Sequence, residues 1–258
     1  MKITALVENI SNKDGIKAEH GLSLYIETEN QTLLFDMGQT DAFADNAKVM
    51  GIDLSGVDVA VLSHGHYDHG GGLKRFLQIN EKAPVYISKY AFESHYNGTE
   101  KYIGLDVSLE KCDRLVYTDD ICEIAKGLTL YSCNGKKKNH DLGSFGLTLK
   151  EQGEYIPDDF RHEQYLLIEE KGKRVLISGC SHKGIMDIAE WFHPDAIVGG
   201  FHYSKLPLDE NLEKYAMYLN SFDTHFYTCH CTGEEQYRFM KSYMTKLNYL
   251  YCGDTIVL

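Results

Sequence analysis

The chain has 258 residues, of which 43% are hydrophobic and 25% charged; this composition is that of a globular protein and excludes a disordered or fibrous chain. Its 38 acidic and 26 basic residues give a formal net charge of −12. Because a field of that sign repels phosphate backbones, we expect no nucleic-acid partner. No apolar stretch is long enough to cross a membrane, and the seven cysteines lack the spacing of a disulfide scaffold. The sequence thus predicts a cytoplasmic protein without a membrane partner.

The first half of the chain reads as short apolar or alternating strands with one helix among them. Its last strand runs directly into the polar run SHGHYDHGGG, and a further helix is expected over Leu73–Ile79. The expected elements before that run are strands at Ile3–Val7, Leu22–Glu27, Thr32–Phe35 and Val57–Ser63, with a helix at Ala42–Met50 before the last of them.

The second half repeats this order of hairpin, helix, buried strand and polar turn. The run YIETENQTLLFDMG resembles LIEEKGKRVLISGC, and VDVAVLSHGHYD resembles PDAIVGGFHYSK. This pairing sets Asp36 opposite Cys180 and His64 close to His202, so the loops after matching strands should converge at one edge. Such internal repetition favours an α/β fold with two packed sheets flanked by helices, a four-layer αββα sandwich. The expected elements are strands at Tyr165–Glu169, Arg174–Ser178 and Ala196–Gly200, with a helix at Ile185–Phe192.

We expect residues 1–258 to form a single domain, since no linker-like stretch interrupts them. Residues of about 95–160 are irregular and polar, with only short strands such as Leu128–Ser132. A long excursion of this kind is either a lid over a substrate or a peripheral insertion. The C-terminal elements expected are helices at Leu208–Leu219 and about Glu234–Lys246 and strands at His225–Thr228 and Thr255–Leu258.

The segment from His64 to Gly72 concentrates metal-binding side chains after an apolar strand. Three imidazoles and a carboxylate within six residues can bind two metal ions, His64 and His66 pointing one way, Asp68 and His69 towards a neighbouring position. Imidazole nitrogen and carboxylate oxygen suit zinc, and also iron or manganese. The three glycines that follow remove side chains where the loop must fold closely.

The run HGHYDH resembles the HxHxDH motif of the metallo-β-lactamase-fold hydrolase superfamily, and LLFDMG resembles the strand ending in its supporting aspartate, here Asp36. Further runs resemble one branch of that superfamily, the proteins similar to the dihydropterin ribofuranosylaminobenzene phosphate synthase. They are HGLSLYI, GCSHKGI at 179–185, GGFH at 199–202 and CHCTG at 229–233. The likeness covers most of the chain except about residues 95–160.

The resemblance implies a site for two divalent metal ions, most simply zinc. The first ion would be held by His64, His66 and a downstream histidine, for which His182 in GCSH is our choice. The second would be held by Asp68, His69 and a C-terminal histidine, for which His230 in CHCTG is our choice.

Three neighbouring positions remain open. Many superfamily members carry a bridging aspartate after Gly-Asp, whereas here the strand ends in Ser178-Gly179-Cys180, so Cys180 is a thiolate ligand, an unligated neighbour of the metals or a small core residue. His162 competes with His182 as ligand of the first ion. His202 is either a substrate-binding donor or a structural histidine. Cys229 and Cys231 should be buried rather than ligating, because strand alternation would turn them away from His230.

The function that follows first is a metal-dependent hydrolase, in which Asp68 orients a metal-activated water and accepts its proton. Its partner would be a small molecule: a phosphoester, a lactone or a pterin-linked phosphate compound. Iron-based oxygen or sulfur redox chemistry on the same fold, a non-catalytic metal-binding protein and an RNA nuclease are the alternatives; the net charge disfavours the last. The sequence carries no indication of the oligomeric state.

Overall fold

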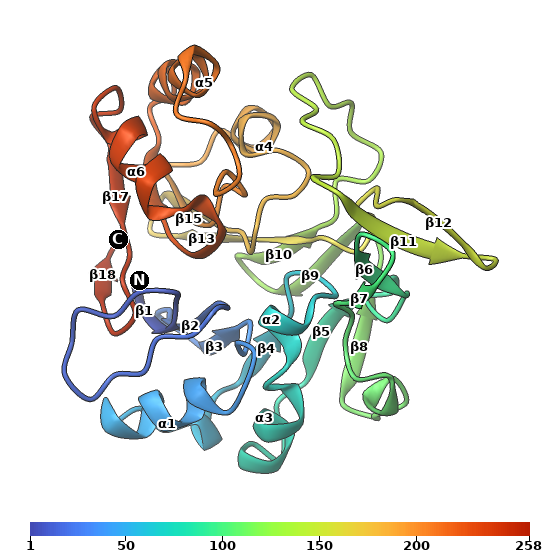
Figure 1. Ribbon diagram of the computed structural model, residues 1–258. Coiled ribbons are helices and arrows are strands. Elements are labelled where there is room, and N and C mark those ends of the chain that lie inside the picture. The colour runs from blue at the N-terminus through green and yellow to red at the C-terminus, as the bar shows by residue number, and fades with distance from the viewer.

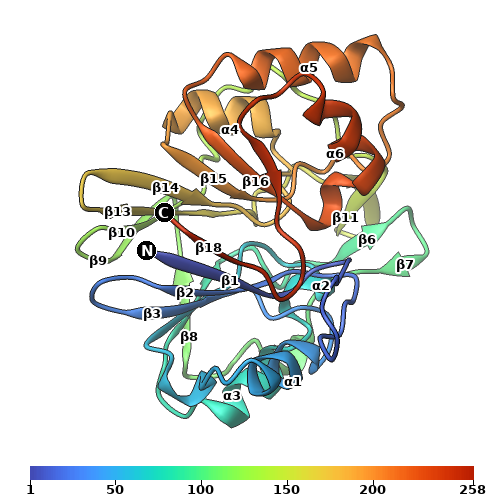
Figure 2. The same ribbon diagram turned by 90° about the vertical axis from the view of Figure 1, so that its left-hand side faces the viewer.

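The computed structural model describes residues 1–258 and consists of two large mixed sheets that face one another, with helices on their outer sides (Figures 1 and 2). The first sheet has the strand order β18 (Thr255–Val257), β1 (Lys2–Val7), β2 (Ser23–Glu27), β3 (Thr32–Phe35), β4 (Val59–Val61), β5 (Val85–Ser88), β8 (Leu115–Thr118). The second has the order β17 (Leu247–Tyr249), β16 (His225–Thr228), β15 (Ala196–Gly199), β14 (Lys173–Ile177), β13 (Tyr165–Glu170), β10 (Leu128–Tyr131), β9 (Ile121–Ala125).

Each sheet is covered on its outer face by helices, as the edge-on view in Figure 2 shows. The helices α1 (Ala42–Val49) and α3 (Leu73–Ile79) pack on the first sheet, and α4 (Ile185–Phe192), α5 (Glu210–Asn220) and α6 (Glu234–Lys241) on the second. The expected four-layer αββα sandwich is thereby confirmed. None of these helices is both long and apolar enough to cross a membrane.

Alternation of side chains explains the three apolar layers. On β3, Leu33 and Phe35 point into the core between the sheets, whereas Leu34 packs under the helices of the first sheet. On β13, Leu166 points into the same central core and Leu167 packs under the helices of the second. Strands covered on both faces need apolar residues in succession, which is the pattern that these runs show.

The two halves share one local order, as the sequence predicts. In each, an antiparallel hairpin, β2–β3 or β13–β14, is followed by a helix and then a strand parallel to the hairpin's second strand, β4 or β15. The carboxyl ends of these parallel strands therefore meet at one edge of the sandwich, and the loops that follow them lie together there.

The stretch of residues 95–160 is more ordered than the sequence indicated and divides into two parts. Its middle supplies β8 and β9, the edge strands of the two main sheets, and β10, which lies between β9 and β13. Its flanks form a separate four-stranded sheet beside the sandwich (Figure 1), of β12 (Glu154–Pro157), β11 (Leu147–Glu151), β6 (His95–Asn97) and β7 (Lys101–Tyr102). The region is thus partly core architecture and partly an added layer next to the loop edge.

Candidate metal centre

The histidine-rich loop leaves the buried strand β4 and enters the short helix α2 (Tyr67–Gly70), which contains Asp68 and His69. The loop lies so close to its surroundings that side chains would collide at its glycines. A Cβ at Gly65 would meet the backbone carbonyl of Ala91, and one at Gly72 the carbonyl of Met37. Glycine is therefore required here by close backbone approach, as the sequence predicts.

The first group of donors consists of His64, His66 and His182. One ring nitrogen of each lies within 4.8 Å of those of the other two. Nε2 of His64 and of His66 and both ring nitrogens of His182 are buried without a hydrogen-bond partner. Burial first, then the neighbouring imidazoles, keep the pKa of all three rings well below its ordinary value, so they are neutral at pH 7. Buried lone pairs without partners are what a metal ion would satisfy.

The second group consists of Asp68, His69 and His230. Nε2 of His69 lies 3.2 Å from Nε2 of His230 and 3.8 Å from Oδ2 of Asp68, and His230 Nε2 is 3.4 Å from that oxygen. Burial alone would raise the pKa of Asp68, but His69, His20 and His230 lower it well below its ordinary value. The carboxylate is therefore an anion, suited to a second divalent ion beside the first.

Both groups are supported from behind. Ser63 Oγ lies 2.7 Å from Nδ1 of His64, and Asp36 Oδ2 lies 2.6 Å from Nδ1 of His69. Each contact engages Nδ1 and leaves Nε2 of the same ring for a metal. Asn9 holds His230 in the same way, with Oδ1 2.9 Å from Nδ1.

Strained backbone accompanies these residues. Asp36, Ser181, His202 and His230 all adopt positive φ, between 48° and 59°. Non-glycine residues in this region cost free energy and concentrate at functional sites. Backbone strain is thus present both at a candidate ligand, His230, and at a residue that supports one, Asp36.

Cys180 lies at the junction of the two groups. Its Sγ is 3.2 Å from Nε2 of His69 and within 4.8 Å of a ring nitrogen of His64. Cys229 and Cys231 are both buried, as expected. Cys229 belongs to the central core, and Cys231 reaches the wall of the cleft, where its Sγ accepts the backbone N–H of His202 at 3.3 Å. The alternation expected around His230 does not apply, because residues 230–232 form a 3-10 turn rather than a strand.

His162, the alternative ligand for the first ion, lies outside the first group. It belongs to a neighbouring buried cluster with His66, His95 and Asp158, and its Nδ1 accepts the backbone N–H of Gly65 at 2.9 Å. Of these two candidates, His182 is the one that groups with both His64 and His66.

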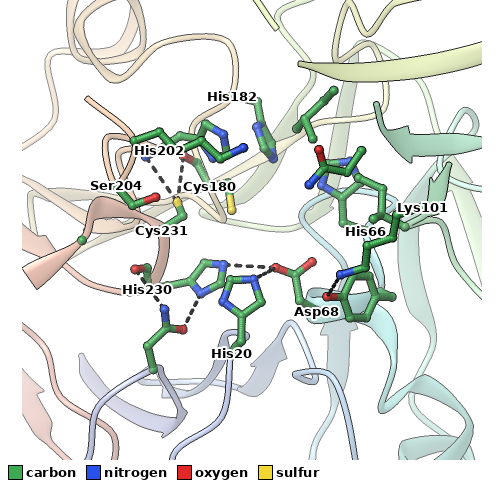
Figure 3. A pocket seen from close by; sticks show the side chains of 17 residues that line it. His20, His66, Asp68, Lys101, Cys180, His182, His202, Ser204, His230 and Cys231 are labelled. Atoms are coloured by element: carbon green, nitrogen blue, oxygen red, sulfur yellow. Dashed lines mark hydrogen bonds and ion pairs between the residues drawn. The ribbon is translucent and has the colours of Figure 1, made fainter. Parts of the chain in front are cut away.

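The donors open into a cleft at the loop edge (Figure 3). His202 lies on its wall beside His182, with ring centroids 4.3 Å apart. Among the cleft residues that the sequence did not reveal are His20, Lys101 and Lys205. His20 Nε2 is 3.2 Å from Oδ2 of Asp68, and its side chain is 57% exposed. His20 is the first residue of the HGLSLYI run, and the resemblance of that run to the related branch was the only feature of the sequence that could have indicated a role for it.

Comparison with known proteins agrees with this arrangement. Residues 16–216 match the family model of the metallo-beta-lactamase superfamily. An uncharacterized protein of Methanocaldococcus jannaschii is 32% identical over 244 residues, 90% of each chain. The 7,8-dihydropterin-6-methyl-4-(beta-D-ribofuranosyl)-aminobenzene-5'-phosphate synthase of that organism is 27% identical, covering 99% of this chain and 96% of the synthase.

A crystal structure of a metal-dependent hydrolase of the beta-lactamase superfamily superposes with a TM-score of 0.85 at 32% identity, over 100% of this chain and 99% of the other. The family match thus spans the histidine loop, the first donor group and most strands of both sheets, and it ends before His230. By its motif, its fold and these similarities, the chain belongs to the metallo-β-lactamase superfamily, whose members are mostly metal-dependent hydrolases.

Proposed function

We propose that the chain is a dinuclear metal-dependent hydrolase that acts on a small anionic ester or lactone, with a phosphate-bearing compound as the preferred class. The observation that carries this proposal is the adjacency of two donor groups, His64, His66 and His182 beside Asp68, His69 and His230, at the floor of an open cleft. Imidazole and carboxylate donors, with a thiol at their junction, favour zinc over manganese or iron.

Bound divalent ions would lower the pKa of a water molecule towards neutrality and polarise the oxygen of the attacked bond. The protein's part is to hold and move the proton. Oδ2 of Asp68, an anion facing the cleft, is the acceptor, and His20, 3.2 Å away and more than half exposed, can pass the proton to solvent. Asp68 would thus orient the water, and His20 would regenerate Asp68 after each turnover.

Charge in the cleft supports an anionic substrate. Lys101 and Lys205 both line it, although the chain as a whole carries a formal charge of −12. Two ammonium groups at the walls would attract and orient a phosphate or carboxylate group. His202, whose Nδ1 is buried without a partner, supplies a further contact for a polar substrate atom. The phosphate in the name of the related synthase points to the same class.

The shape of the site supports a small-molecule partner, because the candidate ligands lie in a cleft with a few polar side chains on its walls. The acidic net charge supports the view that nucleic acid is not a partner.

The experiment that tests this proposal measures metal content and hydrolysis together. Protein purified without chelators or a histidine tag should contain about two zinc ions per chain by mass spectrometry. It should also hydrolyse a chromogenic phosphodiester or a lactone from a screen. Asp68→Ala should abolish turnover in the metal-loaded protein. His225→Gln is the matched control. It removes an exposed imidazole at the start of β16, the strand whose other end leads to His230.

Other outcomes would redirect the assignment. One iron per chain together with oxygen uptake would indicate redox chemistry. Two zinc ions without hydrolysis across the screen would support a non-catalytic metal protein. No metal after reloading would contradict the ligand set itself.

A further inference from the structure

One wall of the cleft is apolar and depends on the added four-stranded sheet. Three side chains form it: Tyr67 of α2, Ile103 directly after β7, and Leu147 at the start of β11. They pack with Phe160 in a small cluster that belongs to none of the three apolar layers of the sandwich. The cluster is therefore a separate apolar surface at the loop edge, and part of it faces the cleft.

This surface is joined to both groups of candidate ligands. Tyr67 directly precedes Asp68 in α2, and its backbone N–H donates to the carbonyl oxygen of Ile103 at 2.9 Å. Phe160 stacks on the ring of His182, with centroids 4.5 Å apart and ring planes 12° apart. An apolar group that lies on this wall is therefore next to the candidate metal centre.

The rest of the cleft is polar. Apart from the candidate ligands, two cysteines and a glycine, its other lining residues carry amide, imidazole, hydroxyl or ammonium groups. Ser204, for example, lies on the opposite side of the cleft from Lys101 (Figure 3). Apolar contact is thus offered by one wall only, which determines how a substrate with an apolar part can lie.

Lys101 adds a positive charge at the rim of the apolar wall. Its Nζ lies 3.2 Å from Oη of Tyr67 and 5.1 Å from the centroid of the same ring. An ammonium group beside an aromatic ring stays charged and attracts anions. A ligand that pairs with Lys101 and also covers the wall must therefore carry an anionic group and an apolar group close together.

We propose that the substrate is an ester whose anionic group binds at Lys101 and whose apolar ring lies on the wall, as in an aryl phosphoester. A flat ring can pack on the aliphatic side chains of Ile103 and Leu147 and meet the ring of Tyr67 edge to face. Ile103 and Leu147 are thus specificity-determining residues without a part in proton transfer. The inference deepens the proposed function and rests on it, because it takes the candidate metal centre as the place of hydrolysis.

Two phosphonates that differ only in the apolar group test this assignment. Phenylphosphonate and methylphosphonate carry the same anionic group and contain no ester bond, so calorimetry on the zinc-loaded protein measures binding alone. We expect the parent protein to bind phenylphosphonate about tenfold more tightly or better, because the phenyl ring loses its contact with water on this wall.

Two variants locate the preference on the wall. Leu147→Ala shortens one of its aliphatic side chains, and Ile103→Thr places a hydroxyl group in it. Each should weaken phenylphosphonate binding about tenfold and leave methylphosphonate binding unchanged. Threonine keeps the β-branched shape of isoleucine, so Ile103→Thr decides the question if Leu147→Ala does not fold.

The matched control is Leu149→Ala, which makes the same truncation two residues further along β11. Leu149 is buried but does not line the cleft. This variant should lower thermal stability and keep the parental preference for phenylphosphonate. An equal loss of preference in Leu149→Ala would show that the wall has a merely structural role.

Two further results would overturn the inference. One is equal affinity of the parent protein for the two phosphonates, and the other is an unchanged preference in both Leu147→Ala and Ile103→Thr. In either case hydrolysis of any ester or lactone by the zinc-loaded protein would leave the proposed function intact. Absence of both hydrolysis and phosphonate binding would overturn the proposed function and the inference together.

Discussion

Oδ2 of Asp36 lies 2.6 Å from Nδ1 of His69, and both side chains are fully buried. The same carboxylate accepts the backbone N–H and the hydroxyl of Ser63, each at 2.7 Å. Asp36 thus connects the end of β3 to the start of the histidine loop and fixes the ring of His69. Because Nδ1 faces this carboxylate, Nε2 is the nitrogen left for a metal.

Asp36→Asn should therefore weaken the second metal ion selectively. The amide cannot accept from both Ser63 and His69 as the carboxylate does, so the ring of His69 loses its orientation. We expect the affinity for one zinc ion to fall about 10–100-fold, measured by chelator competition and by metal content after dialysis.

The control for this variant is Asp45→Asn, which removes an exposed carboxylate that pairs with Lys17 at the surface. It should retain both ions. If Asp36→Asn retained two ions with parental affinity, the supporting role of Asp36 would be wrong.

Glu163 plays the corresponding part for the group of His64, His66 and His182. Its Oε1 accepts the backbone N–H of His182 at 2.7 Å, and its Oε2 that of Lys183 at 3.0 Å. In Glu163→Gln only one of these N–H groups keeps an acceptor, which should cost about 1–3 kcal/mol of unfolding free energy. The turn that carries His182 should loosen.

We expect chelator titration of Glu163→Gln to show weaker binding of one ion, with the ion at Asp68, His69 and His230 unaffected. Glu169→Gln serves as the comparison. Glu169 lies on β13, which begins shortly after Glu163, but its side chain is exposed and forms an ion pair with Arg174. Equal metal binding in the two variants would contradict the assignment.

The sequence predicted the parts of the fold that repeat a pattern. Runs of successive apolar residues located β3 and β13 to within a residue, because both faces of these strands are covered, and helical spacing located α4. The strands β8 and β9 were missed, since they are short edge strands with partly exposed residues such as Ile121. Edge strands have one sheet neighbour and show little of the alternation that reveals a strand.

The candidate site was predictable where ligands stand close together in the chain and much less so elsewhere. His64, His66, Asp68 and His69 form one motif. Lys101 comes from the added sheet and Lys205 from a loop of the second half, so only the folded chain brings them to one cleft. The buried contact between His95 and Asp158 was hidden for the same reason, as 63 residues separate the pair.

Lys101 and Lys205 should act on substrate binding and not on the chemical step. Removing an ammonium group that holds a bound anion typically costs about 1.5–3 kcal/mol, about a tenfold or larger rise in KM. We expect Lys101→Ala and Lys205→Ala each to raise KM for an anionic substrate while kcat changes little. Lys126→Ala, on the turn between β9 and β10, is the exposed control. A neutral lactone should show no such rise; if it did, the loss would reflect a disturbed cleft.

The buried thiol of Cys252 provides a test of pH dependence. Burial raises the pKa of its thiol from 9.0 to about 11, and its Sγ lies 3.3 Å from the carbonyl oxygen of Leu6. Between these two pH values the unfolded chain releases the proton while the folded chain retains it. The free energy of unfolding must therefore fall as the pH rises from 9 to 11, by about 1–2 kcal/mol from this group after allowance for solvent screening.

Denaturant titrations at pH 8 and pH 11 measure this fall. In Cys252→Ala the thiol is absent from the folded and the unfolded state, so its share of the fall in unfolding free energy should vanish. The variant should also be less stable at pH 8, because a buried side chain is truncated. Cys112→Ala is the matched control, because Cys112 is only half-buried at the margin of a core cluster. This variant should show the same fall in the free energy of unfolding between pH 8 and pH 11 as the parent protein. An equal decrease in the Cys252 variant and the parent would show that other groups govern alkaline unfolding, because linkage requires the difference in bound protons to disappear with the thiol.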